Sequence, residues 1–376
     1  MGADVDVVIV GGGLMGAATA YSAARRGMSV ALVDQFPAGH RRGSSHGSAR
    51  IVRRGYADVL YTSLSGRAMQ LWREVESASS ATVLRMTGGL DFGPRRDVPS
   101  VAANLAAQGV PHEVLDAPEA EHRWPGMRFT GPVVFHPEAG TVDSERAAAA
   151  LLGLASAHGA TVRHETAVRA VHADEPGVTL VDGTRLRARS VVVAAGAWLE
   201  PLLGRHLPLP RLRVTQQQIF HFPRLDPSAP PWPSVIHEDV RGVYHLAGGR
   251  DGGPADDRKI GEHDAGRETT ADSRDGVVEP ASQSRVVEYV RRWLPGLDPT
   301  PRGASTCLYT STPSEDFLLD RVGPLVVCSP CSGHGAKFAP LIGELTADLV
   351  QGRTTELPER FRLAAHASGR EAAVSL

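Results

Sequence analysis

Residues 4–34 read DVDVVIVGGGLMGAATAYSAARRGMSVALVD, and this stretch decides the fold. It begins with a short apolar run at residues 4–10 that is typical of a β-strand. A helical pattern follows from Leu14 to about Arg26, and a second apolar run at residues 30–33 indicates another strand. Between the first strand and the helix stand three glycines in G-x-G-x-x-G spacing, Gly11, Gly13 and Gly16.

A glycine turn in this context is typical of dinucleotide binding. The first glycine permits a tight turn, the second lets the backbone approach a pyrophosphate, and the third lets the helix pack on the strand. The helix N-terminus then presents N–H groups and the positive end of its dipole to the phosphates. Asp34 ends the second strand, where an acid accepts hydrogen bonds from ribose hydroxyls. This stretch alone leaves both NAD and FAD open.

Length and composition limit the remaining choices. A chain of 376 residues exceeds the usual size of one hydrophobic core, so we expect two domains. The formal net charge of -2 shows no basic excess and argues against a nucleic-acid partner. No apolar run reaches the roughly 18 residues of a membrane helix, and no cationic stretch of a signal peptide precedes the first strand. We therefore expect a cytoplasmic protein that does not associate with membranes.

Further elements follow from the same patterns. Gly- or Pro-rich stretches at residues 223–233 and 248–257 indicate surface loops. Apolar periodicity predicts helices near residues 63–77, 144–158 and 340–351, and a strand at residues 325–328.

Cysteines and lysines are both scarce. Three cysteines are too few for a disulfide framework, and Cys328 and Cys331 have no second ligand pair at zinc spacing, so we expect no metal site. Of the 40 basic residues, only Lys259 and Lys337 are lysines. The pKa of a lysine falls readily on burial, whereas a guanidinium stays charged. These two lysines are therefore candidates for a role that arginine cannot fill, the alternative being two surface lysines without a function.

Six separated motifs, spread over nearly the whole chain, resemble those of the monomeric sarcosine oxidases and N-methyltryptophan oxidases. These are FAD enzymes of the D-amino-acid oxidase group. The motifs are, in order, residues 43–53 (GSSHGSARIVR), 124–126 (WPG), 195–198 (AGAW), 259–263 (KIGEH), 307–320 (beginning CLY, with EDF at 315–317) and 332–338 (SGHGAKF).

The resemblance implies FAD as the cofactor. It aligns Cys307 with a cysteine bonded covalently to the flavin 8α-methyl, and a thiolate is a suitable nucleophile for that bond. The alternative for Cys307 is a buried apolar cysteine without such a bond. It also places further residues against the cofactor, namely Ser44, His46, Arg50, Gly333, Gly335 and Lys337.

The resemblance also implies roles at the substrate. It aligns Arg53 and Lys337 with the two residues that hold the substrate carboxylate. The planar guanidinium of an arginine and the point charge of a lysine can both bind one carboxylate. Lys259 aligns with a lysine near flavin N5 that activates oxygen by stabilising developing negative charge. His263 and Tyr309 align with polar active-site residues that position the amine or tune its proton. A satisfied structural residue is the alternative for each of these two.

Three positions depart from the family pattern. Ala49 stands in place of a threonine, and Ala336 in place of a phenylalanine. His245 aligns with a pocket tyrosine, so we expect it to bind substrate. The lost phenylalanine opens room around the site, which favours an N-alkyl or cyclic amino acid larger than sarcosine.

We therefore expect an α/β fold of mixed α+β character. A Rossmann-like FAD-binding domain is assembled from the separated segments 1–82, 141–210 and 303–376. A substrate domain with an antiparallel sheet is formed by residues 83–140 and 211–302.

The expected protein is a monomer or weak homodimer that oxidises an N-alkyl or cyclic amino acid to an imine and reduces molecular oxygen to hydrogen peroxide. One alternative is a flavin-dependent dehydrogenase or monooxygenase that does not need Lys259 for oxygen reduction. No second nucleotide-binding glycine motif supports a monooxygenase. Another alternative is a non-catalytic flavin-binding subunit, against which the retained Cys307, Lys259 and Lys337 argue.

Overall fold

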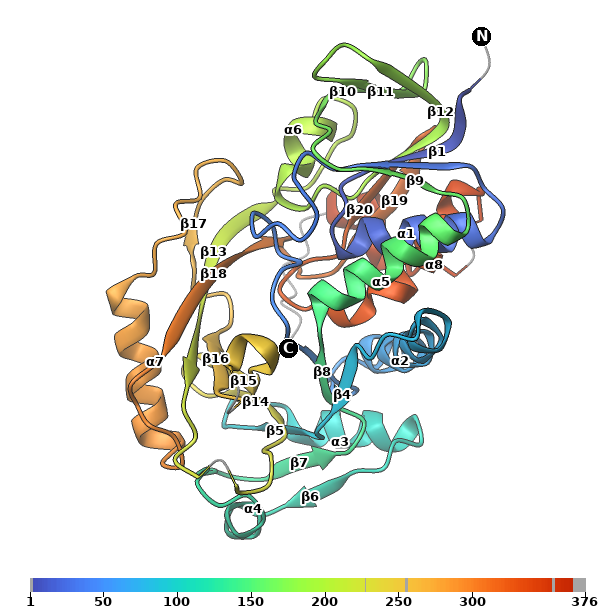
Figure 1. Ribbon diagram of the computed structural model, residues 1–376. Coiled ribbons are helices and arrows are strands. Elements are labelled where there is room, and N and C mark those ends of the chain that lie inside the picture. The colour runs from blue at the N-terminus through green and yellow to red at the C-terminus, as the bar shows by residue number, and fades with distance from the viewer. Residues whose placement is uncertain (1–2, 227, 254–255, 354–355, 368–376) are drawn as a thin grey trace.

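The computed structural model describes residues 3–226, 228–253, 256–353 and 356–367, which form three β-sheets flanked by helices (Figure 1). The expected FAD-binding segments also include residues 1–2, 354–355 and 368–376, and the expected loop at 248–257 includes residues 254–255. All of these lie outside the described part of the chain.

The first sheet contains the glycine turn. Strand β1 lies at its centre, parallel to β2 on one side and to β12 on the other, with Val8 opposite both Ala31 and Val191. β1 from Val7 to Val10 and the whole of β2 are apolar and buried, because both faces of the sheet are covered there. The strands are β1 (Val5–Val10), β2 (Val30–Val33), β9 (Thr161–Arg163), β10 (Val168–His172), β11 (Gly177–Leu180), β12 (Arg185–Val193), β19 (Leu318–Val322) and β20 (Leu325–Ser329).

Helices α1 (Leu14–Arg25), α5 (Ser144–Ala157) and α8 (Ala339–Val350) lie side by side against this sheet (Figure 1). Small residues let them approach closely, since a Cβ on Gly343 of α8 would lie 2.5 Å from the backbone of Ala18 in α1. Helix α2 (Val59–Ser79) packs on α5 and α8 and is capped by Asp58, whose side chain accepts from Leu60 N. Short helices α6 (Leu199–Leu203) and α9 (Leu363–Ala367) complete this half.

The second sheet forms the other half of the molecule. Helix α7 (Pro280–Trp293) packs on it through Val286, Val290 and Trp293, whose spacing places them on one helical face. Two further helices are α3 (Val98–Ala107) and α4 (Ala117–Arg123). The strands are β5 (Gly89–Phe92), β6 (Glu113–Leu115), β7 (Val133–His136), β13 (Arg213–Phe222), β14 (Ser234–Glu238), β15 (Gly242–Ala247), β16 (Arg258–Glu262), β17 (Arg267–Glu268) and β18 (Gly303–Ser311).

A small third sheet lies between the two halves. It joins β3 (Arg50–Val52), β8 (Gly140–Val142) and β4 (Leu84–Met86), so the loop at residues 43–50 leads directly into it. This sheet therefore fixes the start of the segment that carries Arg53.

The fold class is the one expected from the sequence, and two details differ. Strand β18 pairs along its length with β13, so backbone hydrogen bonds join residues 303–311 to the second sheet. The second sheet is also not wholly antiparallel, because β14 runs parallel to β5. The expected helices are present within a few residues of their limits, whereas α3, α4 and α7 were not predicted.

Within the described residues, every helix is too short or too polar to cross a lipid bilayer.

Replacing Gly16 with alanine tests the packing of α1 on β1. The added Cβ would lie 1.8 Å from the carbonyl oxygen of Gly11, so the helix must move. We expect Gly16→Ala to lower the free energy of unfolding by about 1–3 kcal/mol, measured by thermal and denaturant unfolding.

The matched control is Gly153→Ala in α5, where no atom lies within 4 Å of the added Cβ. That change is expected to stabilise the protein by about 0.5–1 kcal/mol, because alanine is the better helix former. Equal stability of the two variants would show that Gly16 is not a packing requirement.

Candidate functional site

One cavity of about 1210 Å³ runs from the glycine turn to the space between the two large sheets. Gly11 and Asp34 line one end, at the carboxyl ends of β1 and β2. Arg53 and Lys337 line the other end. Ligands of open α/β sheets bind at this edge, beyond the carboxyl ends of the strands.

The glycine turn is shaped by close backbone contacts. Gly11 has φ +106°, and a Cβ there would lie 2.6 Å from the carbonyl oxygen of Ala194. Gly13 caps α1 without a side-chain hydrogen bond, and no acid stands in the first turn of the helix. Asp34 Oδ2 accepts a hydrogen bond from Gly12 N at 2.6 Å, which ties the turn to β2. The turn is therefore a rigid cradle of backbone groups suited to a pyrophosphate.

These features fit FAD. Main-chain N–H groups, the positive end of the α1 dipole and the carboxylate of Asp34 converge at one end of the cavity. The same cavity continues past Ser44, His46 and Arg50 to Cys307 and the second sheet. A long two-part ligand can therefore lie along it with its reactive end near Arg53 and Lys337.

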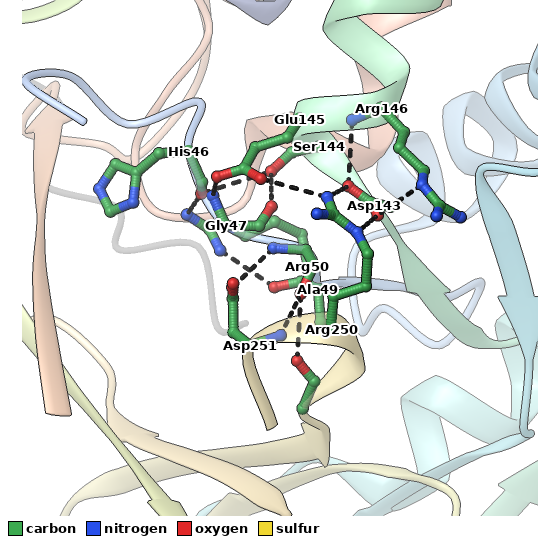
Figure 2. Close-up of polar contacts among 12 residues, drawn as sticks. His46, Gly47, Ala49, Arg50, Asp143, Ser144, Glu145, Arg146, Arg250 and Asp251 are labelled. Carbon is green, nitrogen blue, oxygen red and sulfur yellow. Dashed lines mark hydrogen bonds and ion pairs between the residues drawn. The ribbon is translucent and has the colours of Figure 1, made fainter. Parts of the chain in front are cut away.

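The loop at residues 43–50 is held by its own arginine. The guanidinium of Arg50 donates to the carbonyl oxygens of Ala49, at 3.0 Å, and of His46 (Figure 2). It also donates to the carbonyl oxygen of Ser44 at 3.2 Å. Ser44 Oγ in turn donates to the carbonyl oxygen of Leu308. Burial and the charge of Arg50 lower the pKa of His46 to about 3, so this histidine is neutral at pH 7.

A second loop braces the first, and this contact could not be predicted from the sequence. Asp251 Oδ2 accepts from Ser48 N at 2.7 Å, and Glu145 Oε1 accepts from Gly47 N at 2.8 Å. Arg250 pairs with Asp143 at 2.9 Å and with Glu145 at 3.1 Å, as Figure 2 shows. The stretch at 248–257 carries only a loop signal, and contacts between residues 105 to 203 positions apart have no local pattern.

Lys259 lies in the cavity wall on β16. It is 4% exposed, and its Nζ donates to the carbonyl oxygen of Ala49 at 2.9 Å. Burial, together with the nearby Arg50, lowers the pKa of Lys259 to about 7. The lysine is therefore poised between its charged and neutral forms at physiological pH.

Cys307 and Tyr309 lie two positions apart on β18, so both side chains reach the cavity. Cys307 is a free thiol with 9% exposure. Tyr309 is hydrogen-bonded to Tyr244, and burial raises its pKa well above the ordinary value. Cys328 and Cys331 are also free thiols, and no group of metal-binding side chains occurs in the described chain.

Arg53 and Lys337 flank the ring of Tyr56. The Arg53 guanidinium lies 4.0 Å and the Lys337 ammonium 5.6 Å from the ring centroid. Lys337 Nζ donates to the carbonyl oxygen of His334 at 2.7 Å, whereas Arg53 Nη1 has no hydrogen-bond partner among the described residues. Burial and the charge of Arg53 lower the pKa of Lys337 well below its ordinary value. Two buried cations so placed form a site for an anion.

His263 and Tyr309 pack against the bare backbone of Gly333. A Cβ on Gly333, which has φ +74°, would lie 2.5 Å from the Tyr309 ring and 2.7 Å from the His263 ring. His263 Nε2 lies 3.8 Å from Glu315 Oε1 and has no hydrogen-bond partner among the described residues. Gly335 is equally constrained, because its Cβ would lie 1.7 Å from the carbonyl oxygen of Pro330.

Two of the expected site residues do not line the cavity. Gly16 lies behind Gly11 and serves packing alone. His245 was expected to bind substrate, but the side chains of β15 alternate, and its neighbours Tyr244 and Leu246 line the cavity instead. His245 is buried on the other face, where its Nδ1 accepts from Arg258 Nε at 2.9 Å. The expected place of His245 in the substrate pocket is therefore wrong.

All other expected site residues line this one cavity. The chain is 30% identical to a monomeric sarcosine oxidase of Bacillus sp. (strain NS-129), over 95% of each chain. It is 31% identical to the N-methyl-L-tryptophan oxidase of Citrobacter koseri, over 93% of this chain and 95% of the relative. The crystal structure of NikD, an amino acid oxidase of nikkomycin biosynthesis, superposes with a TM-score of 0.84 at 27% identity, over 96% of this chain and 97% of NikD. A family model described as FAD dependent oxidoreductase matches residues 6–349, and the chain therefore belongs to that family.

Proposed function

We propose that the protein is an FAD-dependent amine oxidase that converts an N-alkyl or cyclic amino acid to an imine and reduces oxygen to hydrogen peroxide. The observation that carries this proposal is that Arg53 and Lys337 share one cavity with the dinucleotide-binding glycine turn. A small carboxylate bound by these two cations would lie at the inner end of that cavity, between the two large sheets.

Arg53 and Lys337 would bind the substrate carboxylate. Burial lowers the pKa of both side chains, and the charge of Arg53 lowers the pKa of Lys337 further. A carboxylate between them removes the repulsion and accepts charge-assisted hydrogen bonds, including one from the unpaired Arg53 Nη1. The bound anion therefore favours the protonated form of Lys337.

His263 and Tyr309 would orient the amine. Their rings close the space over Gly333, and His263 Nε2 has no hydrogen-bond partner of its own in the described chain. FAD, when bound, supplies the acceptor for the hydride equivalent from the carbon next to the amine nitrogen and passes the electrons to oxygen. The buried walls exclude water while the substrate is held.

Lys259 would supply positive charge where oxygen is reduced. Its Nζ is fixed by the carbonyl oxygen of Ala49, so no reorganisation is needed when negative charge develops nearby. Cys307 lines the same cavity and would provide the thiol for a covalent bond to the flavin.

Room beside Lys337 supports a substrate larger than sarcosine. Ala336 lines the cavity and offers only a methyl group at its position. The relatives include oxidases named for sarcosine and for N-methyl-L-tryptophan, so this family accommodates side chains of different size.

The bond to Cys307 can be tested by denaturing the protein in acid. We expect the flavin to stay with the wild-type polypeptide and to be released from Cys307→Ser, because serine offers no thiolate. Cys331→Ser is the control, since Cys331 also lines the cavity and its variant should retain the flavin. Flavin release from the wild type would exclude a covalent bond.

The role of Lys259 predicts a pH dependence. Because its folded-state pKa is about 7, the ammonium prevails below that pH and is lost above it. The rate constant for oxidation of the reduced enzyme by oxygen, measured by stopped flow, should therefore fall as the pH rises from 6 to 8.

Lys259→Met should lower this rate constant about 100-fold or more and abolish the pH step. His46 and His221, with pKa values of about 3 and 4, do not titrate in this range. An unchanged rate in Lys259→Met would instead support a dehydrogenase that uses another acceptor.

Peroxide release over a panel of N-methyl and cyclic amino acids tests the substrate class. Each compound is paired with the amine that lacks its carboxylate, and we expect kcat/KM to be about 100-fold higher for the acid, because two charged hydrogen-bond donors face it. Equal rates for acid and amine would contradict the proposed carboxylate site. No turnover of any compound would favour a flavin-binding subunit.

A further inference from the structure

Behind Arg53 lies a row of buried charges that the proposed reaction does not use. Asp91 Oδ1 lies 3.7 Å from Arg53 Nη1 and 2.7 Å from Arg96 Nη2. Arg96 Nη1 then reaches Glu238 Oε1 at 2.8 Å. The signs alternate along the row, which ends in the cavity at both Arg53 and Glu238.

The row is too deeply buried to be a surface ion pair. The side chains of Arg96 and Asp91 are 0% and 1% exposed, and Arg96 Nη2 also donates to the carbonyl oxygen of Gly55 at 3.2 Å. Buried charges are costly unless they are paired, and such a row adds little stability over apolar side chains of similar volume. Its presence next to a substrate-binding arginine therefore points to a function.

The backbone is shaped around the Asp91 carboxylate. A Cβ on Gly55 would lie 2.6 Å from Asp91 Oδ2 and 3.2 Å from His136 Nε2. Burial lowers the pKa of His136 to about 4, so this neighbour is neutral at pH 7. The two arginines, and not the histidine, therefore balance the charge of Asp91.

Arg53 is held in a way that keeps a donor free. Its guanidinium stacks on Tyr56 from one side, and Asp91 attracts it at a distance too long for a hydrogen bond. Arg53 Nη1 thus remains without a hydrogen-bond partner in the described chain, although the side chain is only 4% exposed. A closer carboxylate would accept a hydrogen bond from Arg53 Nη1 and occupy it. If there were no carboxylate at this place, the guanidinium would have no fixed direction.

We propose that Asp91, itself fixed by Arg96, is a positioning residue that orients Arg53 toward the substrate carboxylate. This inference rests on the proposed role of Arg53 in binding that carboxylate. Asp91 comes from β5 of the second sheet and Arg53 from the segment after β3, so the contact also aligns two separate parts of the chain.

The test is binding of cyclopentanecarboxylate, which has no amine to oxidise, to the FAD-loaded enzyme by titration calorimetry. We expect Asp91→Asn to raise its Kd about tenfold and Arg53→Lys to raise it at least as much. The double variant should bind no more weakly than Arg53→Lys, because orientation is lost with the guanidinium. Cyclopentanecarboxamide, which carries no charge, should show no such change.

Asp97→Asn is the matched control, since it makes the same chemical change at an exposed helix cap that asparagine serves equally well. Its Kd should equal that of the wild type. If Asp91→Asn fails to fold or to retain FAD, Arg96→Lys replaces it, because lysine keeps the charge but loses the fork that pairs with Asp91 and Glu238 at once. The same weakening is expected.

A simple electrostatic role predicts the opposite sign. Removing a negative charge beside Arg53 would by itself strengthen the binding of an anion, so an unchanged or lower Kd in Asp91→Asn overturns the inference. Full additivity in the double variant does the same. If the wild type does not bind the probe, or Arg53→Lys binds it normally, the proposed carboxylate site fails instead.

Discussion

The arrangement of the cavity depends on the free-energy cost of burying positively charged side chains. Arg53, Lys259 and Lys337 all lie in the walls of one cavity and are almost inaccessible to water. Each must be offset by a partner, a lowered pKa or a bound anion. Asp91 partly offsets the charge of Arg53, and burial lowers the pKa of Lys259 to about 7. Burial also lowers the pKa of Lys337, whose charge would be offset by a bound anion. The carboxylate of the proposed substrate would complete this charge balance.

The three cations come from both halves of the fold. Lys259 belongs to the second sheet, Lys337 precedes α8 on the first, and Arg53 follows the small sheet between them. The cavity exists because the halves meet there, and Arg250 and Asp251 of the loop at 248–253 fasten the junction by pairing with Asp143 and with Ser48 N. A shift of one half against the other would separate the charges.

Sequence alone predicted those features that depend on local pattern. The glycine turn, the first two strands and α1 follow from the pattern of residues 4–34. Nearly all of the site residues expected from the motif resemblance line one cavity. The resemblance did not show which side chains of β15 point into the cavity. His245 was expected there, but it lies on the opposite face of the strand, against Arg258. It also could not reveal Asp91, because its pairing with Arg53 and Arg96 arises only when distant strands meet.

The anchor of Lys259 has an evolutionary consequence. Its ammonium is held by the main-chain oxygen of residue 49 and not by a side chain. Every amino acid presents that oxygen, so the side chain at this position can drift without releasing the lysine. Ala49, where the family resemblance implies a threonine, is a change that this arrangement tolerates. Selection can thus remodel this loop while the ammonium of Lys259 stays where it is.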